Sequence, residues 1–290
     1  MRALNCSENQ LKNLPESIGQ LKKLEILFCH RNRLETLPES IGQMECLQLL
    51  YCDRNQMTHL PESIGQLEHL TTLHCGDNLL TTIPESIGHL KCLKCLYCNN
   101  NQLKTLPESI DHLKFLDILF CERNQMTHLP ETIGQMECLE TLFCGSNQLT
   151  ALPESINQLK CLKYLHCYGN HLNNLPEFND QMKCLCQLYC FNNQLTTLPE
   201  SIGQLSQLND LRCSKNQLTA LHESITQLEV LHELDCSDNH FEMLPESIPR
   251  LKNLIRVDFS RNRISGMSAE WISLFERISV DLYDNPIDIQ

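Results

Sequence analysis

An asparagine recurs every 23 residues along this chain of 290, at thirteen positions from Asn9 to Asn285. A leucine-rich segment precedes each asparagine, and in most repeats a run similar to Leu37-Pro38-Glu39-Ser40-Ile41 follows it. A fixed period of this length indicates stacked coils that each contact only their neighbours, rather than one globular core. We therefore expect one continuous solenoid over residues 1–267, followed by a capping helix and the last coil over residues 268–290.

Each coil begins with a short segment in which inward and outward positions alternate. Leu50 and Cys52 alternate with Leu49 and Tyr51, which is the two-residue period of a strand. Ten coils carry proline six residues after the asparagine, usually followed by Glu-Ser-Ile, and this combination suits the first turn of a helix. The sequence predicts an α/β solenoid, curved as a horseshoe, with parallel strands on the concave face and short helical or 3₁₀ segments on the convex face.

Two invariant columns have structural interpretations. The asparagine side-chain amide can satisfy backbone groups of adjacent turns, so we expect it to be a spine of the fold and not a binding site. The glutamate after each proline, such as Glu39 or Glu62, repeats once per coil and is interpreted as a solvated outer edge.

Eleven of the eighteen cysteines stand three residues before the asparagine, where the last two coils carry Phe259 and Leu282. The position is an inward one, and we expect these cysteines to be buried as small apolar residues. Neighbouring thiols in parallel strands would lie about 4.8 Å apart, slightly beyond the Cβ separation of a relaxed disulfide. Unpaired thiols favour a reducing, cytoplasmic location.

Charge and hydropathy exclude two classes of partner. The chain carries 36 acidic and 23 basic side chains, a formal net charge of −13, which would repel a phosphate backbone, so we expect no nucleic-acid partner. No apolar run approaches the roughly 18 to 20 residues of a membrane span, and the first residues lack the apolar stretch of a secretory signal. We expect no membrane insertion.

The frame Leu-x-x-Leu-x-Cys-x-x-Asn-x-Leu, followed by Leu-Pro-Glu-Ser-Ile-Gly-Gln-Leu, resembles the leucine-rich repeat family with 23-residue repeats, over essentially the whole chain. Near-copies such as residues 54–62 and 123–131 indicate repeat duplication. Uniform arrays of this kind resemble the cytosolic repeats of small-GTPase signalling scaffolds and the effectors that bacterial pathogens inject into host cells. The resemblance implies a protein-binding horseshoe, placed in the host cytosol if the chain is a secreted effector, but it identifies no partner.

The residue four before each asparagine should point outward from the concave sheet, and this column carries rings in eight successive coils. Six aromatic residues that each exposed half of a burial capacity of about 150 Å² would present roughly 450 Å² of apolar surface, the size of the largest patch on a typical monomer. The predicted partner-binding residues of this column are Phe28, Tyr51, His74, Tyr97, Phe120, Phe143, His166 and Tyr189. The column six before the asparagine adds Leu49, Ile118 and Tyr164.

The rings stop at Tyr189, and charged residues such as Arg212 and Asp235 occupy the same column in the following coils. Aromatic residues suit strands in general, and duplication could copy a ring that has no role, but strand preference alone would not end at this border. We predict that a protein docks an apolar segment along the rings while the charged end orients it. The alternative is a structural or self-associating scaffold that uses the same face to form a homodimer.

Spacings that imitate catalytic or metal sites have simpler interpretations. Cys95 and Cys98 are three residues apart in a strand and point to opposite faces, which argues against a shared zinc ion. Cys75-Gly76-Asp77 matches the Cys-x-Asp nucleophile motif of some pathogen effectors in its letters only, because Cys75 belongs to the buried column. His74 and His166 are expected to be surface contacts that titrate near pH 6.5. We expect no catalysis, no metal and no cofactor.

Near the end of the chain, Trp271, Leu274, Phe275 and Ile278 follow the i, i+3, i+4, i+7 pattern of an amphipathic helix. This pattern predicts a helix over residues 268–277, and residues 281–287 would complete the C-terminal cap.

Overall fold

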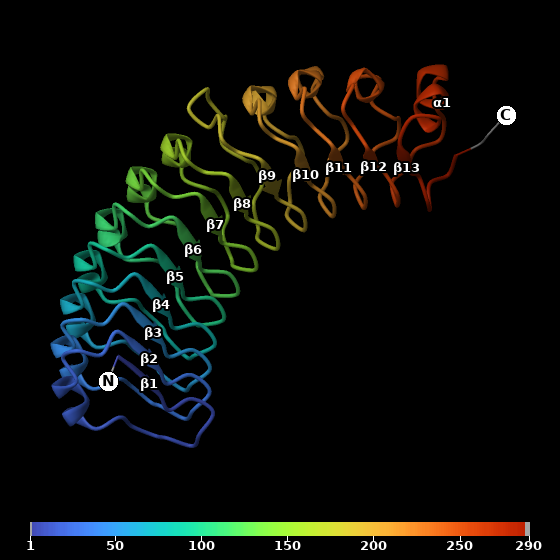
Figure 1. Cartoon of the computed structure of the whole chain (residues 1–290). Coiled ribbons are helices and arrows are strands. Elements are labelled where there is room, and N and C mark those ends of the chain that lie inside the picture. Colours follow the sequence, from blue (N-terminus) through green and yellow to red (C-terminus); the bar gives the residue numbers. More distant parts are fainter. Residues whose placement is uncertain (1, 288–290) are drawn as a thin grey trace. The chain divides into compact units, whose positions relative to one another are not determined.

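The computed structural model describes residues 2–287, which form two compact units divided between Gln148 and Leu149. The described residues contain thirteen strands of three residues, ten 3₁₀ segments and one α-helix. In each unit the strands line one side of the coils and the 3₁₀ segments line the other (Figure 1). This arrangement confirms the predicted α/β solenoid.

The first unit contains seven strands that pair in parallel and in chain order. Each strand residue pairs with the residue 23 positions later, for example Leu27 with Leu50, so the strand register follows the asparagine period. The strands are β1 (Ala3–Asn5), β2 (Ile26–Phe28), β3 (Leu49–Tyr51), β4 (Thr72–His74), β5 (Cys95–Tyr97), β6 (Ile118–Phe120) and β7 (Thr141–Phe143). The 3₁₀ segments are η1 (Glu16–Gln20), η2 (Glu39–Gln43), η3 (Glu62–Gln66), η4 (Glu85–His89), η5 (Glu108–His112) and η6 (Glu131–Gln135).

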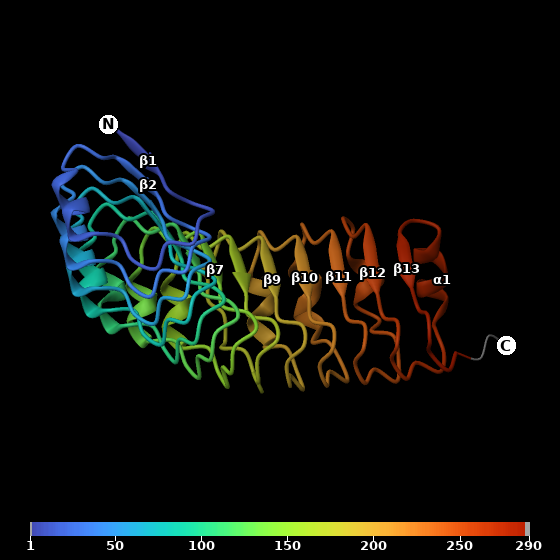
Figure 2. The ribbon, with the colours of Figure 1, turned by 90° about the horizontal axis from the view of Figure 1, so that it is seen from below.

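The second unit repeats the pattern with six strands, again paired in parallel with an offset of 23 residues, as in Leu188 with Leu211. Figure 2 shows β9 to β13 side by side, with the helix α1 next to β13. The strands are β8 (Tyr164–His166), β9 (Gln187–Tyr189), β10 (Asp210–Arg212), β11 (Glu233–Asp235), β12 (Arg256–Asp258) and β13 (Ser279–Asp281). The helical elements are η7 (Glu154–Gln158), η8 (Glu200–Gln204), η9 (Glu223–Gln227), η10 (Ile248–Arg250) and α1 (Ala269–Phe275).

Leucine and cysteine fill the interior of the coils. Leu50 and Cys52 are fully buried, whereas Tyr51 between them is only half-buried on the opposite side of the strand, as the alternation predicted. The thiol of Cys52 donates a hydrogen bond to the carbonyl oxygen of His74 in the next coil, 3.2 Å away. Burial raises the pKa of the Cys98 thiol to about 12. From Cys29 to Cys236 the cysteines of this column are buried, which confirms the sequence interpretation, whereas Cys6 in the first coil is half-buried.

The asparagine side chain connects each coil to the one before it. The Asn101 amide nitrogen donates to the carbonyl of Cys98 in its own coil and to that of Cys75 in the preceding coil, each at 3.1 Å. Its Oδ1 accepts the backbone N–H of Leu80 at 2.9 Å. The same three bonds recur at other coils, including Asn78, Asn124 and Asn216. The predicted spine is confirmed.

The Pro-Glu-Ser segment differs from the predicted helix start. Pro38 has φ −68° and ψ 149°, an extended conformation, so it precedes η2 as the N-cap instead of lying in its first turn. Glu85 accepts the backbone N–H of Ser109 in the next coil at 3.1 Å, and hydrogen bonding from Ser109 holds the pKa of Glu85 below its usual value. The glutamates thus link adjacent 3₁₀ segments, and their interpretation as a purely solvated edge was incomplete.

The single α-helix among the described residues, α1, is shorter than the predicted helix over residues 268–277. Fewer of its apolar residues face the coils than the sequence pattern predicted. Trp271 and Leu274 are buried, and the Trp271 indole packs edge to face on Phe259 and donates to the carbonyl of Pro245 at 3.2 Å. Phe275 is 39% exposed, because a helix of two turns places only Trp271 and Leu274 against the last coils. The boundary between residues 1–267 and 268–290 stays a prediction, and residues 288–290 lie outside the described part of the chain.

Replacing Asn101 with alanine should lower the free energy of unfolding by about 3 kcal/mol, because a buried N–H and two buried carbonyls lose their partner. Asn9→Ala is the matched control, since Asn9 is exposed and bonds only to carbonyls of its own coil, those of Cys6 and Ser7. We expect it to cost less than about 1 kcal/mol. Urea unfolding followed by circular dichroism measures both, and equal losses would contradict the spine.

Candidate functional site

Six ring-bearing side chains form a continuous row on the strand face of the first unit, the face made by the first and last residues of its strands. Because the strand register repeats exactly with the coil period, each ring lies beside the ring of the next strand. Ring centroids are 4.5 Å apart between Tyr51 and His74 and 3.9 Å apart between His74 and Tyr97. The row consists of the last residues of β2 to β7, Phe28, Tyr51, His74, Tyr97, Phe120 and Phe143.

The rings stack on one another. The His74 plane makes angles of 15° with Tyr51 and 12° with Tyr97, whereas Tyr97 meets Phe120 edge to face at 82°. Each of these side chains is half-buried, since adjacent rings cover much of its faces. Where the planes are nearly parallel, as around His74, neighbouring rings cover the ring faces and leave the edges toward solvent. The half exposure on which the expectation of roughly 450 Å² rested is not reached by these rings.

Two aliphatic side chains flank the row. Leu49 and Ile118 occupy the first positions of β3 and β6, so they lie on the same side of their strands as Tyr51 and Phe120. Both are half-buried. The structure thus brings together all the residues of this unit that the sequence predicted for the site, and their role in binding stays a prediction.

Four rings form a compact block on the strand face of the second unit. His166 and Tyr189, the last residues of β8 and β9, stack with centroids 4.1 Å apart and planes at 11°. Tyr168 and Phe191 follow two residues later in each coil and stack at 4.6 Å and 3°. The predicted residue Tyr164 begins β8 and is 37% exposed. Tyr168 and Phe191 were not among the predicted site residues, although rings at the same position of successive coils were the signal for them.

Arg212 joins this ring block to the charged strands. Its guanidinium carbon lies 4.8 Å from the centroid of the Tyr189 ring, and its nitrogens bond to Asp210 at 3.1 and 3.2 Å and to Glu233 at 3.2 Å. The Tyr189 hydroxyl donates to the same Asp210 carboxylate. Burial, together with this bond to Asp210, raises the pKa of Tyr189 to about 12. Asp210 is the buried centre of the network, and sequence reasoning did not select it because its depth depends on the neighbouring strands.

The Asp235 carboxylate accepts hydrogen bonds from the turn that follows its own strand. Its Oδ1 accepts the backbone N–H of Ser237 at 3.0 Å and the Ser237 hydroxyl at 2.7 Å. Asp258 makes the same bond to the N–H of Ser260 at 2.9 Å. Turn formation therefore accounts for aspartate in this column, a local role that competes with the partner contact predicted for Asp235.

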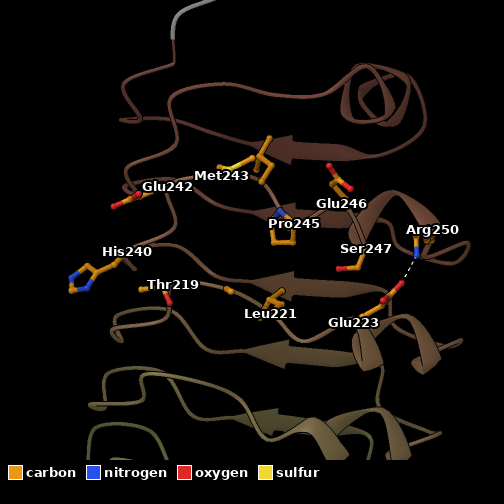
Figure 3. A pocket seen from close by; sticks show the side chains of 12 residues that line it. Thr219, Leu221, Glu223, His240, Glu242, Met243, Pro245, Glu246, Ser247 and Arg250 are labelled. Atoms are coloured by element: carbon orange, nitrogen blue, oxygen red, sulfur yellow. Dashed lines mark hydrogen bonds and ion pairs between the residues drawn. The ribbon is translucent and has the colours of Figure 1, made fainter.

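A hollow of about 660 Å³ opens between the coils that contain β10 and β11, on their 3₁₀ side (Figure 3). Elsewhere glycine lets the 3₁₀ segments pack closely, since a Cβ at Gly203 would lie 2.5 Å from the Ser224 carbonyl oxygen. The next coil carries Thr226 at this position, and η10 in the following coil starts late and is short. The close packing that Gly203 allows is therefore not repeated in the next two coils.

The titratable groups of the hollow are spread along its rim. Arg250 pairs with Glu223 at 2.6 Å at one end, and His240 lies at the other end, beyond Met243 and Pro245 (Figure 3). A general acid and a general base must lie within reach of one reacting group. The rim shows no such convergence among its labelled side chains, so the hollow gives no support to catalysis.

Metal and membrane sites can be assessed for residues 2–287. In that range no three His, Cys, Asp or Glu side chains are grouped to hold a metal ion. Cys95 is half-buried on the strand face and Cys98 is fully buried, which confirms that the two point to opposite sides. No helix in the same range has the length and apolar character to cross a bilayer.

Comparison with known proteins identifies the repeat as leucine-rich. Residues 1–71 and 53–119 match the model of a leucine-rich repeat region, and residues 230–251 match a leucine-rich repeat. None of the curated protein sequences matches the chain. A leucine-rich repeat protein from Leptospira interrogans is similar in structure, with a TM-score of 0.82 and 34% identity over 99% of this chain and 79% of that chain.

Two further structures are informative. The functional domain of InlJ from Listeria monocytogenes, described as including a cysteine ladder, has a TM-score of 0.78 and 26% identity over 99% of this chain and 63% of that one. The plant peptide hormone receptor RGFR1, in complex with RGF2, has a TM-score of 0.59 and 25% identity over 99% of this chain and 60% of the receptor chain.

Acidification should destabilise the second unit through His166. Burial lowers the pKa of His166 to about 4, so this ring does not titrate near pH 6.5 as expected from sequence, and burial also lowers the pKa of His74. Between the folded pKa of His166 and the unfolded value, the unfolded chain binds more protons, so stability is lost as the pH falls through this window. The native chain should lose free energy of unfolding between pH 7 and pH 5, and His166→Gln should make this loss smaller by about 1 kcal/mol, a value reduced to allow for the partial exposure of the ring.

Urea unfolding at a series of pH values measures this effect. His232→Gln is the control, because His232 lies in the same unit and is exposed. A His166→Gln protein that keeps the full pH dependence of the native chain would show that another group is responsible.

Proposed function

The chain belongs to the leucine-rich repeat family, and from that premise we propose that it is a non-enzymatic recognition module that binds a protein partner on its strand face. The observation that carries this proposal is the row of six stacked rings from Phe28 to Phe143. A protein partner is also the ligand class that fits an acidic chain with a ring-lined sheet.

Preorganisation supports this role for the rings. Binding costs free energy when mobile side chains must become ordered at the interface. In the row, neighbours hold each ring before any partner arrives, as His74 is held between Tyr51 and Tyr97. Aromatic anchors of this kind often dominate binding energies. The proposed partner segment is therefore apolar and lies against ring edges, with hydrogen bonds to the tyrosine hydroxyl groups.

Polar contacts in the second unit would give such a partner its orientation. Arg212 is held by Asp210 and Glu233 in one geometry over the Tyr189 ring. A charged side chain that is already oriented contributes specificity more than affinity. The complex of RGFR1 with RGF2 shows that a protein with this fold can be found with a ligand bound, and we extend that property to this chain as part of the proposal.

We further propose a cytoplasmic site of action, in the host cytosol if the chain is a secreted bacterial effector. The similarity to proteins of Leptospira interrogans and Listeria monocytogenes supports a bacterial origin for this kind of array. A translocation reporter fused to the chain tests the proposal, because a bacterium that retains the fusion during contact with host cells would argue against an effector.

Self-association through the same face is the second candidate function. The exposed ring edges of one copy could contact those of another, although two copies with a net charge of −13 repel each other at low salt. Light scattering distinguishes the two functions. A concentration-dependent dimer that is lost in a Tyr97→Asp, Phe120→Asp double variant would favour homodimerisation over binding of another protein.

Peptides selected from a random library against the native chain provide a probe for the proposed face. We expect Phe120→Ala to weaken their binding by about 10- to 30-fold, because a central aromatic anchor contributes about 2 kcal/mol. Isothermal titration calorimetry with the selected peptides measures this change.

Phe115→Ala is the matched control, since Phe115 is 60% exposed but lies in the turn before β6 instead of on the strand face. It should change the dissociation constant less than about twofold. The proposal is wrong if no peptide is enriched, or if both variants bind the peptides as the native chain does.

A further inference from the structure

A second cysteine column lies outside the core, fourteen residues after the asparagine. Five cysteines of this column are exposed and free, Cys46, Cys92, Cys138, Cys161 and Cys184. Within the second unit, Cys161 and Cys184 occupy this position in two successive coils. They are the two thiols of that unit that the repeat places side by side on the surface.

The strand register brings these two residues close. Tyr164 pairs with Gln187 three residues beyond each cysteine, and the backbone N–H of Cys186 bonds to the carbonyl of Lys163 at 2.8 Å. Residues 160–161 and 183–184 form the same turn before β8 and β9. Equivalent residues of adjacent parallel strands lie about 4.8 Å apart, which falls within the Cα separation of about 4.4 to 6.8 Å found for disulfides.

Cys161 and Cys184 lie in turns, so they are free of the strand spacing that keeps the buried cysteines too far apart for a disulfide. Inside the strands, hydrogen bonds on both sides keep neighbouring Cβ atoms about 4.8 Å apart, too far for a relaxed disulfide. Cys161 and Cys184 precede the strands, and an exposed turn can tilt its side chains together. The coil that contains β8 also lacks a 3₁₀ segment, because Phe178-Asn179-Asp180 replaces Ser-Ile-Gly there. A covalent link would reinforce an irregular coil.

Basic residues surround the pair in an otherwise acidic chain. Lys160 and Lys183 immediately precede the two cysteines, and Lys163 lies two residues after the first. Positive charge near an exposed thiol attracts anionic reagents. A negatively charged disulfide such as oxidised glutathione is the oxidant that fits this surrounding.

We propose that Cys161 and Cys184 form a disulfide between successive coils when a small anionic disulfide oxidises them. One cysteine thiolate attacks a sulfur of oxidised glutathione, which forms a mixed disulfide and releases one glutathione thiolate. The thiolate of the other cysteine then attacks the protein sulfur of the mixed disulfide and releases the second glutathione. The two protein thiols lose two electrons to oxidised glutathione, and their protons pass to solvent and to the released thiolates.

The chain contains a matched control for this reaction. Cys92 is exposed at the same column and is flanked by Lys91 and Lys94, in the same Lys-Cys-Leu-Lys sequence that surrounds Cys161. The adjacent coils carry His69 and Phe115 at this position, so neither coil offers Cys92 an equivalent thiol. Cys92 should therefore stop at the mixed disulfide with glutathione.

The test is to incubate the folded chain with excess oxidised glutathione, alkylate the remaining thiols and map the peptides by mass spectrometry. We expect a Cys161–Cys184 cross-link two hydrogens lighter than the separate peptides, and glutathione on Cys92. In Cys161→Ser, glutathione should remain on Cys184, at least about tenfold more abundant there than in the native chain. Unfolding in urea should abolish the preference for this pair.

Three results would overturn the proposal. They are glutathione carried separately by Cys161 and Cys184 in the folded chain, both thiols left unmodified while Cys92 reacts, or a cross-link from either cysteine to a different one. Circular dichroism before and after oxidation verifies that each variant remains folded, so none of these results can be attributed to unfolding.

Discussion

The hydrogen bonds of the repeated asparagine are the constraint on which the rest of the structure depends. One side chain satisfies carbonyls of two coils and the N–H of a residue in the coil before it, as Asn101 does with Cys98, Cys75 and Leu80. These groups lie where the chain turns away from the strand and has no ladder partner. Buried backbone groups without partners are costly, so the period of 23 residues cannot drift by one residue without a penalty in every coil.

A constant register has consequences on both sides of the coil. On the strand face it places like positions in contact, so residues chosen once per coil become continuous stacks, as in the contact of His74 with Tyr97. On the outer side it places Glu85 against the backbone N–H of Ser109 and glycine against the serine of the next coil. Local substitutions therefore act on a neighbouring coil. The irregular coil around Phe178, which lacks a 3₁₀ segment, is one such effect.

The same stacking changes the chemistry of the proposed binding face. A ring that stood alone on a sheet would offer its face to a partner and leave a histidine in contact with water. In the row, neighbouring rings occupy the faces of His74, and in the ring block of the second unit burial lowers the pKa of His166 to about 4. Along the row, each ring is held by its neighbours, and in the second unit Arg212 is held by Asp210. Both features suit the proposed recognition role, because side chains that are already ordered lose less conformational freedom on binding.

The sequence by itself determined the period, the alternation of Leu50 and Cys52 with Tyr51, the burial of the cysteine column and the alignment of the rings, because each depends only on short-range geometry repeated in register. It also indicated the 3₁₀ side, although not that Pro38 would precede the segment or that the glutamates would bond to the next coil. Only the tertiary structure decided how far the rings cover one another, which carboxylate holds Arg212 and where the outer packing opens. Those features depend on distances between side chains of different coils, and a pattern of residue types within one coil does not contain those distances.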